Sequence, residues 1–93
     1  MGIMAGQYSA DDVAVFMGLE LKRLGELHQE EIAWTIQQRF GKEFVYQNKN
    51  LNLAIAKPVL DAFRERTPDV VWEKGGRYWR YRQPWDSKKR AQE

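Results

Sequence analysis

The chain has 93 residues, of which 43% are hydrophobic and 13% aromatic, and it contains no cysteine. This length supports one small core, and the composition is typical of a globular domain rather than a disordered chain. The absence of cysteine excludes disulfides, a thiolate zinc site and a cysteine nucleophile, and a reducing cytoplasm is the simplest location. No apolar run approaches the roughly 20 residues that span a bilayer, so we expect no membrane partner.

The net charge of +2 is distributed unevenly along the chain. The last part, residues 73–93, holds seven of the 15 Lys and Arg residues but three of the 13 acidic residues. Such a basic end indicates a surface that meets phosphate or another acidic partner, although a solvated basic tail gives the same pattern. We divide the chain into a disordered leader (1–8), a single winged-helix-like domain (9–85) and a basic tail (86–93).

The first helix is predicted over residues 10–24. Ser9 is a good N-cap with Asp12 three residues later, and Gly25 can adopt the left-handed conformation that ends a helix. The next residues form a short connection that is expected to lay Leu27 against a sheet.

A second helix is predicted over residues 30–40, with Gly41 as its stop. Its apolar stripe includes Ile32 and Ile36, and Trp34 lies about 200° from Ile32 on a helical wheel. This tryptophan is therefore expected to face away from the core. It either packs under a neighbouring loop or forms part of a self-association patch.

Residues 42–56 contain two short apolar runs around a polar Gln-Asn-Lys-Asn segment, which predicts an irregular hairpin before the third helix. Pro58 suits the first turn of that helix, which is expected to continue to Arg66.

Residues 70–82 then predict a second hairpin with Gly75-Gly76 as a two-residue turn. This register pairs Trp72 with Trp79 and Val70 with Tyr81, and it turns those four side chains toward the helices. The other face is predicted to carry Val71, Glu73, Tyr78 and Arg80. The stretch from Ser87 onward is expected to be disordered. The fold class that follows is α+β, a small winged-helix-like domain of three helices with a C-terminal β-hairpin.

Four segments of the chain carry a resemblance to known sequences: Phe44-Val45-Tyr46, Asn52-Leu53-Ala54-Ile55, Val59-Leu60-x-x-Phe63 and Trp72-x-x-x-x-Arg77-Tyr78-Trp79-Arg80. Together they resemble a family of small, uncharacterised bacterial proteins that is classed as a domain of unknown function. The likeness covers residues 10–84, and its Arg-Tyr-Trp-Arg element is the most specific part. It implies a compact winged-helix-like domain and relatives carried on phage or mobile gene cassettes, and it transfers no activity. Ala56 stands where relatives have a capping Ser or Thr, which leaves the start of the third helix open.

No residue pattern specifies a reaction. His28 is the only histidine, so it has no second histidine or cysteine with which to form a typical metal cluster. Glu30 and Glu31 are adjacent and point in different directions on a helix, which makes them a poor acid and base pair. We therefore predict a protein that is not an enzyme, with no metal, no cofactor and no small-molecule ligand.

Two functions of different classes remain. The first is binding of double-stranded DNA through a basic wing, a winged-helix analogue of the helix-turn-helix, in which cationic side chains contact phosphates. The candidate residues are Lys74, Arg77, Arg80 and Arg82 of the hairpin, with Arg64 and Arg66 of the third helix. Asp61 and Glu65 on that helix would oppose phosphates. The second function is a protein-interaction module or homodimer that binds no nucleic acid, with Trp34 and Trp85 at the interface.

Overall fold

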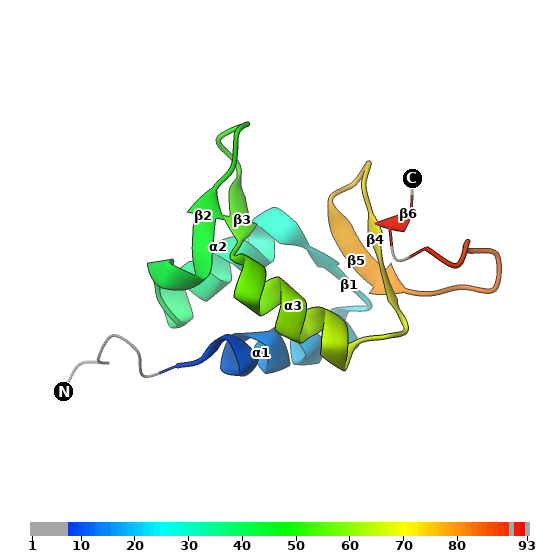
Figure 1. The fold of residues 1–93 in the computed structure, drawn as a ribbon, viewed down its shortest axis with the longest axis horizontal. Helices are drawn as coiled ribbons and strands as arrows, with labels where there is room; N and C mark the ends of the chain where they lie inside the picture. Colours follow the sequence, from blue (N-terminus) through cyan, green and yellow to red (C-terminus); the bar gives the residue numbers. More distant parts are fainter. Residues whose placement is uncertain (1–7, 90, 93) are drawn as a thin grey trace.

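The computed structural model describes residues 8–89 and 91–92 of the chain. Within these ranges lie three α-helices, one 3₁₀ turn and six short strands (Figure 1). Their order is α1 (Ala10–Leu24), β1 (Glu26–His28), α2 (Gln29–Arg39), η1 (Lys42–Phe44), β2 (Val45–Gln47), β3 (Leu53–Ile55), α3 (Lys57–Arg66), β4 (Val70–Glu73), β5 (Tyr78–Tyr81) and β6 (Ala91–Gln92). The predicted α+β class, with three helices and a C-terminal antiparallel strand pair, is confirmed.

Helix α1 begins and ends where the sequence predicted, because both of its ends are specified locally. The Ser9 hydroxyl accepts from the backbone N–H of Asp12 at 3.1 Å, and the Asp12 carboxylate accepts from the N–H of Ser9 at 2.8 Å. These two bonds form a capping box. At the other end, Gly25 takes φ +86° and its N–H donates to the carbonyl of Leu21 at 2.7 Å. The turn at Gly25 directs the chain into β1.

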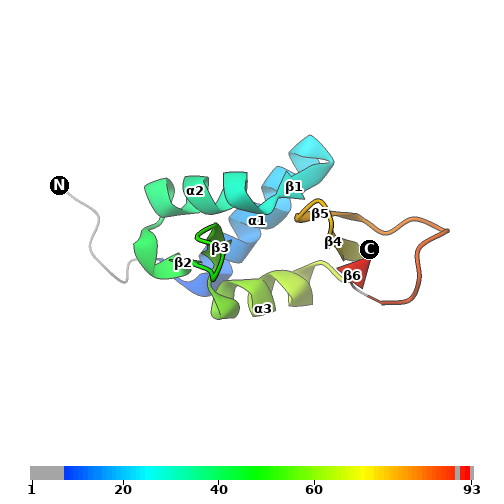
Figure 2. The same cartoon turned by 90° about the horizontal axis from the view of Figure 1, so that it is seen from above.

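The larger sheet of the described residues has the strand order β1-β5-β4-β6 (Figure 2). Strands β4 and β5 pair antiparallel in the predicted register, with Val70 opposite Tyr81 and Trp72 opposite Trp79. On the other side of β5, Leu27 of β1 lies opposite Trp79. The expectation that Leu27 lies against the sheet is confirmed, since its side chain is 1% exposed.

The turn between β4 and β5 differs from the prediction of a two-residue Gly75-Gly76 turn. The loop spans residues 74–77, and the N–H of Arg77 closes it by donating to the carbonyl of Glu73 at 2.8 Å. The left-handed residue is Arg77, with φ +53°, and neither glycine has a positive φ. Gly76 is required for another reason: a Cβ there would lie 2.5 Å from the ring of Tyr78. Packing of the tyrosine ring, rather than backbone conformation, explains the second glycine.

The outer face of the hairpin also differs from the prediction. Val71 was expected on a solvent-facing surface but is 1% exposed. It lies opposite Arg80 in the β4-β5 ladder, and the Arg80 guanidinium bonds to Glu73 and Asp86. The chain after β5 returns to this region and pairs β6 parallel to β4. Asp86, in this returning segment, holds Arg80 beside Val71 on the face that a bare hairpin would expose.

The C-terminal stretch also differs from the prediction, since it was expected to be disordered from Ser87 onward. The guanidinium of Arg82 donates to the carbonyls of Ser87, Lys88 and Lys89, and Ala91–Gln92 forms β6. Most of the predicted leader, residues 1–7, lies outside the described residues, but Tyr8 packs its ring edge-on against Phe40 at 4.8 Å.

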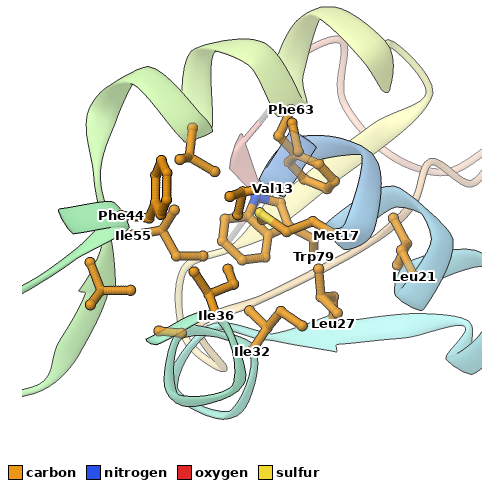
Figure 3. Packing of buried hydrophobic residues seen from close by; sticks show 14 of the residues in the cluster. Val13, Met17, Leu21, Leu27, Ile32, Ile36, Phe44, Ile55, Phe63 and Trp79 are labelled. Atoms are coloured by element: carbon orange, nitrogen blue, oxygen red, sulfur yellow. The ribbon is translucent and has the colours of Figure 1, made fainter. Parts of the chain in front are cut away.

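The core lies between α1, α2 and α3 and the inner face of the larger sheet (Figure 3). Its fully buried side chains point toward one another from every one of these elements. The largest are Phe63, Met17, Leu21, Leu27, Ile36, Ile55, Val13 and Val59. Strands β2 and β3 form a separate two-stranded sheet, which confirms the hairpin predicted within residues 42–56. In the part of the chain described, no helix is long and apolar enough to cross a membrane.

Candidate functional site

Arg80, the central cation of the predicted basic hairpin, is held by two carboxylates. Its guanidinium bonds to both oxygens of Asp86 at 2.7 and 2.8 Å and to Glu73 at 2.8 and 2.9 Å. The side chain of Arg80 is 18% exposed and that of Asp86 is 4% exposed. Together with the backbone N–H of Gln83, Arg80 lowers the pKa of Asp86 to about 2, and both carboxylates raise the pKa of Arg80. This arginine therefore joins β5 to the returning C-terminal segment.

Arg77 and Arg82 also make contacts within the protein. Arg77 donates to Glu30 of α2 at 3.0 Å, and its backbone carbonyl accepts from the N–H of Gln29 at 3.0 Å. With its amide oriented to satisfy both neighbours, Asn52 donates to Glu30 and accepts from Arg77. Arg82 donates to three carbonyls of the segment that follows β5. Glu30 offsets the charge of Arg77, and the three carbonyls occupy N–H donors of Arg82 that a phosphate would need.

The other predicted cations lie at separate places. Arg66, at the end of α3, lies 4.0 Å from Asp11 of α1. Arg64 lines a small hollow with Trp72, Trp79 and other residues of the hairpin region. Lys74 is exposed in the β4-β5 loop, where the turn places it at the tip of the hairpin. At the start of α3 the exposed Lys57 is paired with Asp61 at 2.8 Å.

The two tryptophans predicted for an interface are both exposed, but they do not form one patch. Trp34 on α2 is 60% exposed and Trp85, after β5, is 79% exposed. Figures 1 and 2 show α2 and the segment that follows β5 on separate parts of the molecule. Trp34 lines a shallow hollow on α2 together with Glu30, Glu31 and Thr35.

A groove that the sequence did not predict lies beside this hollow, where α1, β1 and α2 meet. We call it the acidic groove; its volume is about 400 Å³. Its lining residues are Glu20, Leu24, Glu26, Leu27, His28, Glu31, Ile32 and Thr35. The turn at Gly25 creates it, because the chain reverses there and brings the end of α1 against the start of α2. Leu27 and Ile32 are buried and form an apolar floor.

The rim of the acidic groove is negatively charged. Glu20, Glu26 and Glu31 come from three different elements. A hydrogen bond from Arg23 lowers the pKa of Glu20, and the imidazole of His28 lies 2.6 Å from Glu26. The His28 ring also stacks on Tyr78 at 5.0 Å between centroids, which fixes its position over β5.

The acidic groove also continues into an exposed apolar surface. Leu24 at one end of the groove is 54% exposed, and the groove shares Glu31 and Thr35 with the hollow beside Trp34. The result is an apolar path with carboxylates along it. The sequence analysis weighed Glu30 and Glu31 only as an acid and base pair. The signal for the groove is the excess of acids within residues 20–31.

The polar side chains of the acidic groove make contacts within the protein. Among the residues that the structure describes, no group of three or more His, Cys, Asp or Glu side chains is placed to hold a metal ion. The His28–Glu26 contact has no neighbouring nucleophile on the groove lining, since Thr35 bonds to the carbonyl of Glu31 at 3.2 Å.

Comparison with known proteins gives one match. Residues 9–81 match DUF6953, a family of unknown function. No curated protein and no solved structure matches the chain. The matched range covers α1 through β5 and therefore includes the whole acidic groove.

Proposed function

This chain belongs to DUF6953, a family of unknown function, and we propose that it is a protein-interaction module, not an enzyme, whose acidic groove binds a basic and apolar segment of a partner protein. The observation that carries the proposal is the groove itself: three carboxylates surround an apolar floor of Leu27 and Ile32.

The chemistry of the groove favours a lysine or arginine side chain flanked by aliphatic residues. Such a side chain can lay its methylene stem on the apolar floor while its charged end meets Glu26 or Glu31. A volume of about 400 Å³ holds a few side chains and not a whole domain. The exposed Leu24 and Trp34 extend the apolar contact at the two ends, and tryptophan is a residue type that often anchors interfaces.

Charge complementarity sets the type of partner. The carboxylates of the groove attract cations and repel phosphate, so an acidic peptide or a nucleic acid is disfavoured here. Because the rim is exposed to solvent, added salt should screen the attraction and weaken binding.

A direct test uses a fluorescein-labelled amphipathic peptide of lysine and leucine, with a glutamate-leucine peptide as its acidic counterpart. We expect anisotropy to show binding of the basic peptide only. The variant Glu26→Lys/Glu31→Lys should weaken that binding by at least about tenfold, about 1.4 kcal/mol. The matched control Glu43→Lys/Glu65→Lys makes the same change in net charge at exposed positions outside the groove.

The two double variants separate a site from a general charge effect. If the control pair weakens binding as much as the groove pair, the attraction belongs to the whole molecule and the groove is not the site. Equal affinity for the acidic peptide would also refute the proposal.

DNA binding is a second candidate, supported by the order of elements. A short strand between α1 and α2 pairs with the hairpin that follows α3, and this pairing supports a winged-helix-like organisation. In such domains the third helix and the wing meet DNA. Against this candidate, Arg77 and Arg80 are already engaged by carboxylates. Binding that neutralises four phosphates would give a log-log salt slope of roughly −3.6 in a duplex titration; absence of binding at low salt would refute it.

A further inference from the structure

Helix α1 carries a second exposed apolar surface, on the side that faces away from the core. Val15 is 41% exposed and Leu19 is 61% exposed, and they lie one helical turn apart. The buried side chains of α1, among them Met17 and Leu21, point in the opposite direction. This surface is separate from the acidic groove, to which α1 contributes Glu20 and Leu24.

Gly18 lies between these two side chains, and the chain itself gives no reason for a glycine there. A Cβ added at Gly18 would meet no heavy atom of the described residues within 4 Å, apart from the backbone of its own helix. Its φ is not positive. Glycine is unfavourable inside a helix relative to alanine. A close approach by another molecule would explain the missing side chain.

The surface around Gly18 is also hollowed. A groove of about 330 Å³ runs along α1 beside the connection from α3 to β4. Ala14, Val15, Gly18 and Leu19 line one side of it, and Arg66, Thr67, Asp69 and Tyr81 line the other. A leucine side chain from a partner could enter this groove over Gly18.

Charges on the same face are arranged symmetrically about Met17. Asp11 and Asp12 lie in the first turn of α1, and Lys22 and Arg23 lie in the last turn. Three pairs of residues lie at equal distances from residue 17 along the helix: Asp11 and Arg23, Asp12 and Lys22, and Val15 and Leu19. Among the described residues Lys22 makes no ion pair. A face of this kind is complementary to its own antiparallel copy.

We propose that a second copy of this chain packs its α1 against this face, antiparallel, about a two-fold axis at the level of Met17. Val15 of each copy then contacts Leu19 of the other copy, and Gly18 allows the helices to approach closely. On a helical wheel Asp11 and Lys22 lie on one side of this face and Asp12 and Arg23 on the other, so Asp11 lies near Lys22 of the second copy, and Asp12 lies near Arg23. Arg23 also holds Glu20 in its own helix at 2.8 Å, so it shares its guanidinium between two carboxylates.

Association should be weak, because one pair of helices buries less than the roughly 800 Å² per partner of a standard interface. Sedimentation equilibrium of the full chain from about 1 μM to about 1 mM covers the relevant range. We expect the dimer at the highest concentrations of this range. Leu19→Glu should weaken it by at least about tenfold, whereas Leu51→Glu, at a leucine that is 73% exposed in the β2-β3 loop, should leave it unchanged.

Two further variants test the close approach and the direction of the helices. Gly18→Ala should raise the unfolding temperature of the monomer and weaken the dimer several-fold, opposite effects that a purely structural glycine would not produce. Asp11→Arg should weaken the dimer, and adding Lys22→Asp should restore it, because the antiparallel charge pair is then reversed rather than lost.

The proposal is overturned by a wild-type chain that stays monomeric at about 1 mM. It is also overturned if Leu51→Glu weakens association as much as Leu19→Glu, or if Gly18→Ala leaves association unchanged or strengthens it. A third contrary result is an Asp11→Arg/Lys22→Asp chain that associates as weakly as Asp11→Arg. Circular dichroism of each variant confirms that the chain compared is folded.

Discussion

The four tryptophans should differ widely in their contribution to stability, and Trp79 should contribute most. Its indole is 6% exposed, lies 4.6 Å from the Trp72 ring and 5.5 Å from the Phe63 ring, and sits opposite Leu27 in the sheet. An aromatic side chain buries about 150–250 Å². At about 25 cal/mol per Å² this corresponds to about 4–6 kcal/mol, close to the usual loss of about 3–5 kcal/mol for replacing a buried aromatic residue by alanine.

The same deletion at Trp34 provides the comparison, since that side chain is 60% exposed on α2. Trp34→Ala removes less than half as much buried area, and alanine recovers about 0.5 kcal/mol of helix propensity. We expect a loss of about 1 kcal/mol. A domain of this size has a total stability of about 5–14 kcal/mol, so Trp79→Ala should remove a large fraction of it.

Urea unfolding followed by circular dichroism measures both variants. The Trp79→Ala midpoint should fall far below that of the wild type, and the Trp34→Ala midpoint should stay near it. A loss at Trp34 as large as that at Trp79 would refute the assignment of Trp34 to the surface and of Trp79 to the core.

Two other predictions concern the ends of the fold. Asp86 has a pKa of about 2 in the folded chain, below its ordinary value. Its carboxylate therefore stabilises the fold above about pH 4 and loses this effect as the pH falls toward about 2. The urea midpoints measured at about pH 7 and about pH 3 should differ less in Asp86→Asn than in the wild type. Ser9→Ala should cost about 0.5–2 kcal/mol because it removes one bond of the capping box, and Ser9→Asp should retain most of the stability; equal losses in both variants would argue against capping.

The parts of the fold that the sequence predicted correctly depend on local signals. The bounds of α1 follow from Ser9 and Gly25, which act within a few residues of themselves. The register of β4 and β5 follows from the alternation of large side chains around Trp72 and Trp79. These interactions need little information from distant parts of the chain.

The parts of the fold that the sequence predicted wrongly, or did not predict, depend on residues distant in the chain. The β4-β5 loop has Arg77 in the left-handed conformation, and that residue bonds to Glu30, 47 positions earlier in the sequence. Val71 is buried on a face to which the chain returns only after β5. The acidic groove joins side chains from three elements, and no spacing along the sequence shows that Glu20 and Glu31 border the same groove.

Nuclear magnetic resonance can locate a bound peptide on the chain and so test whether the acidic groove is the binding surface. Backbone amide shifts of the labelled full chain are followed while the lysine-leucine peptide is added, and in a parallel titration with duplex DNA. We expect the largest peptide-induced shifts in residues 20–35, with smaller shifts in β5 because β5 pairs with β1 and Tyr78 stacks on His28, and no shift in α3. Peptide-induced shifts that are largest outside residues 20–35, or shifts of the β4-β5 hairpin and α3 on adding DNA, would refute the assignment of the groove as the binding surface.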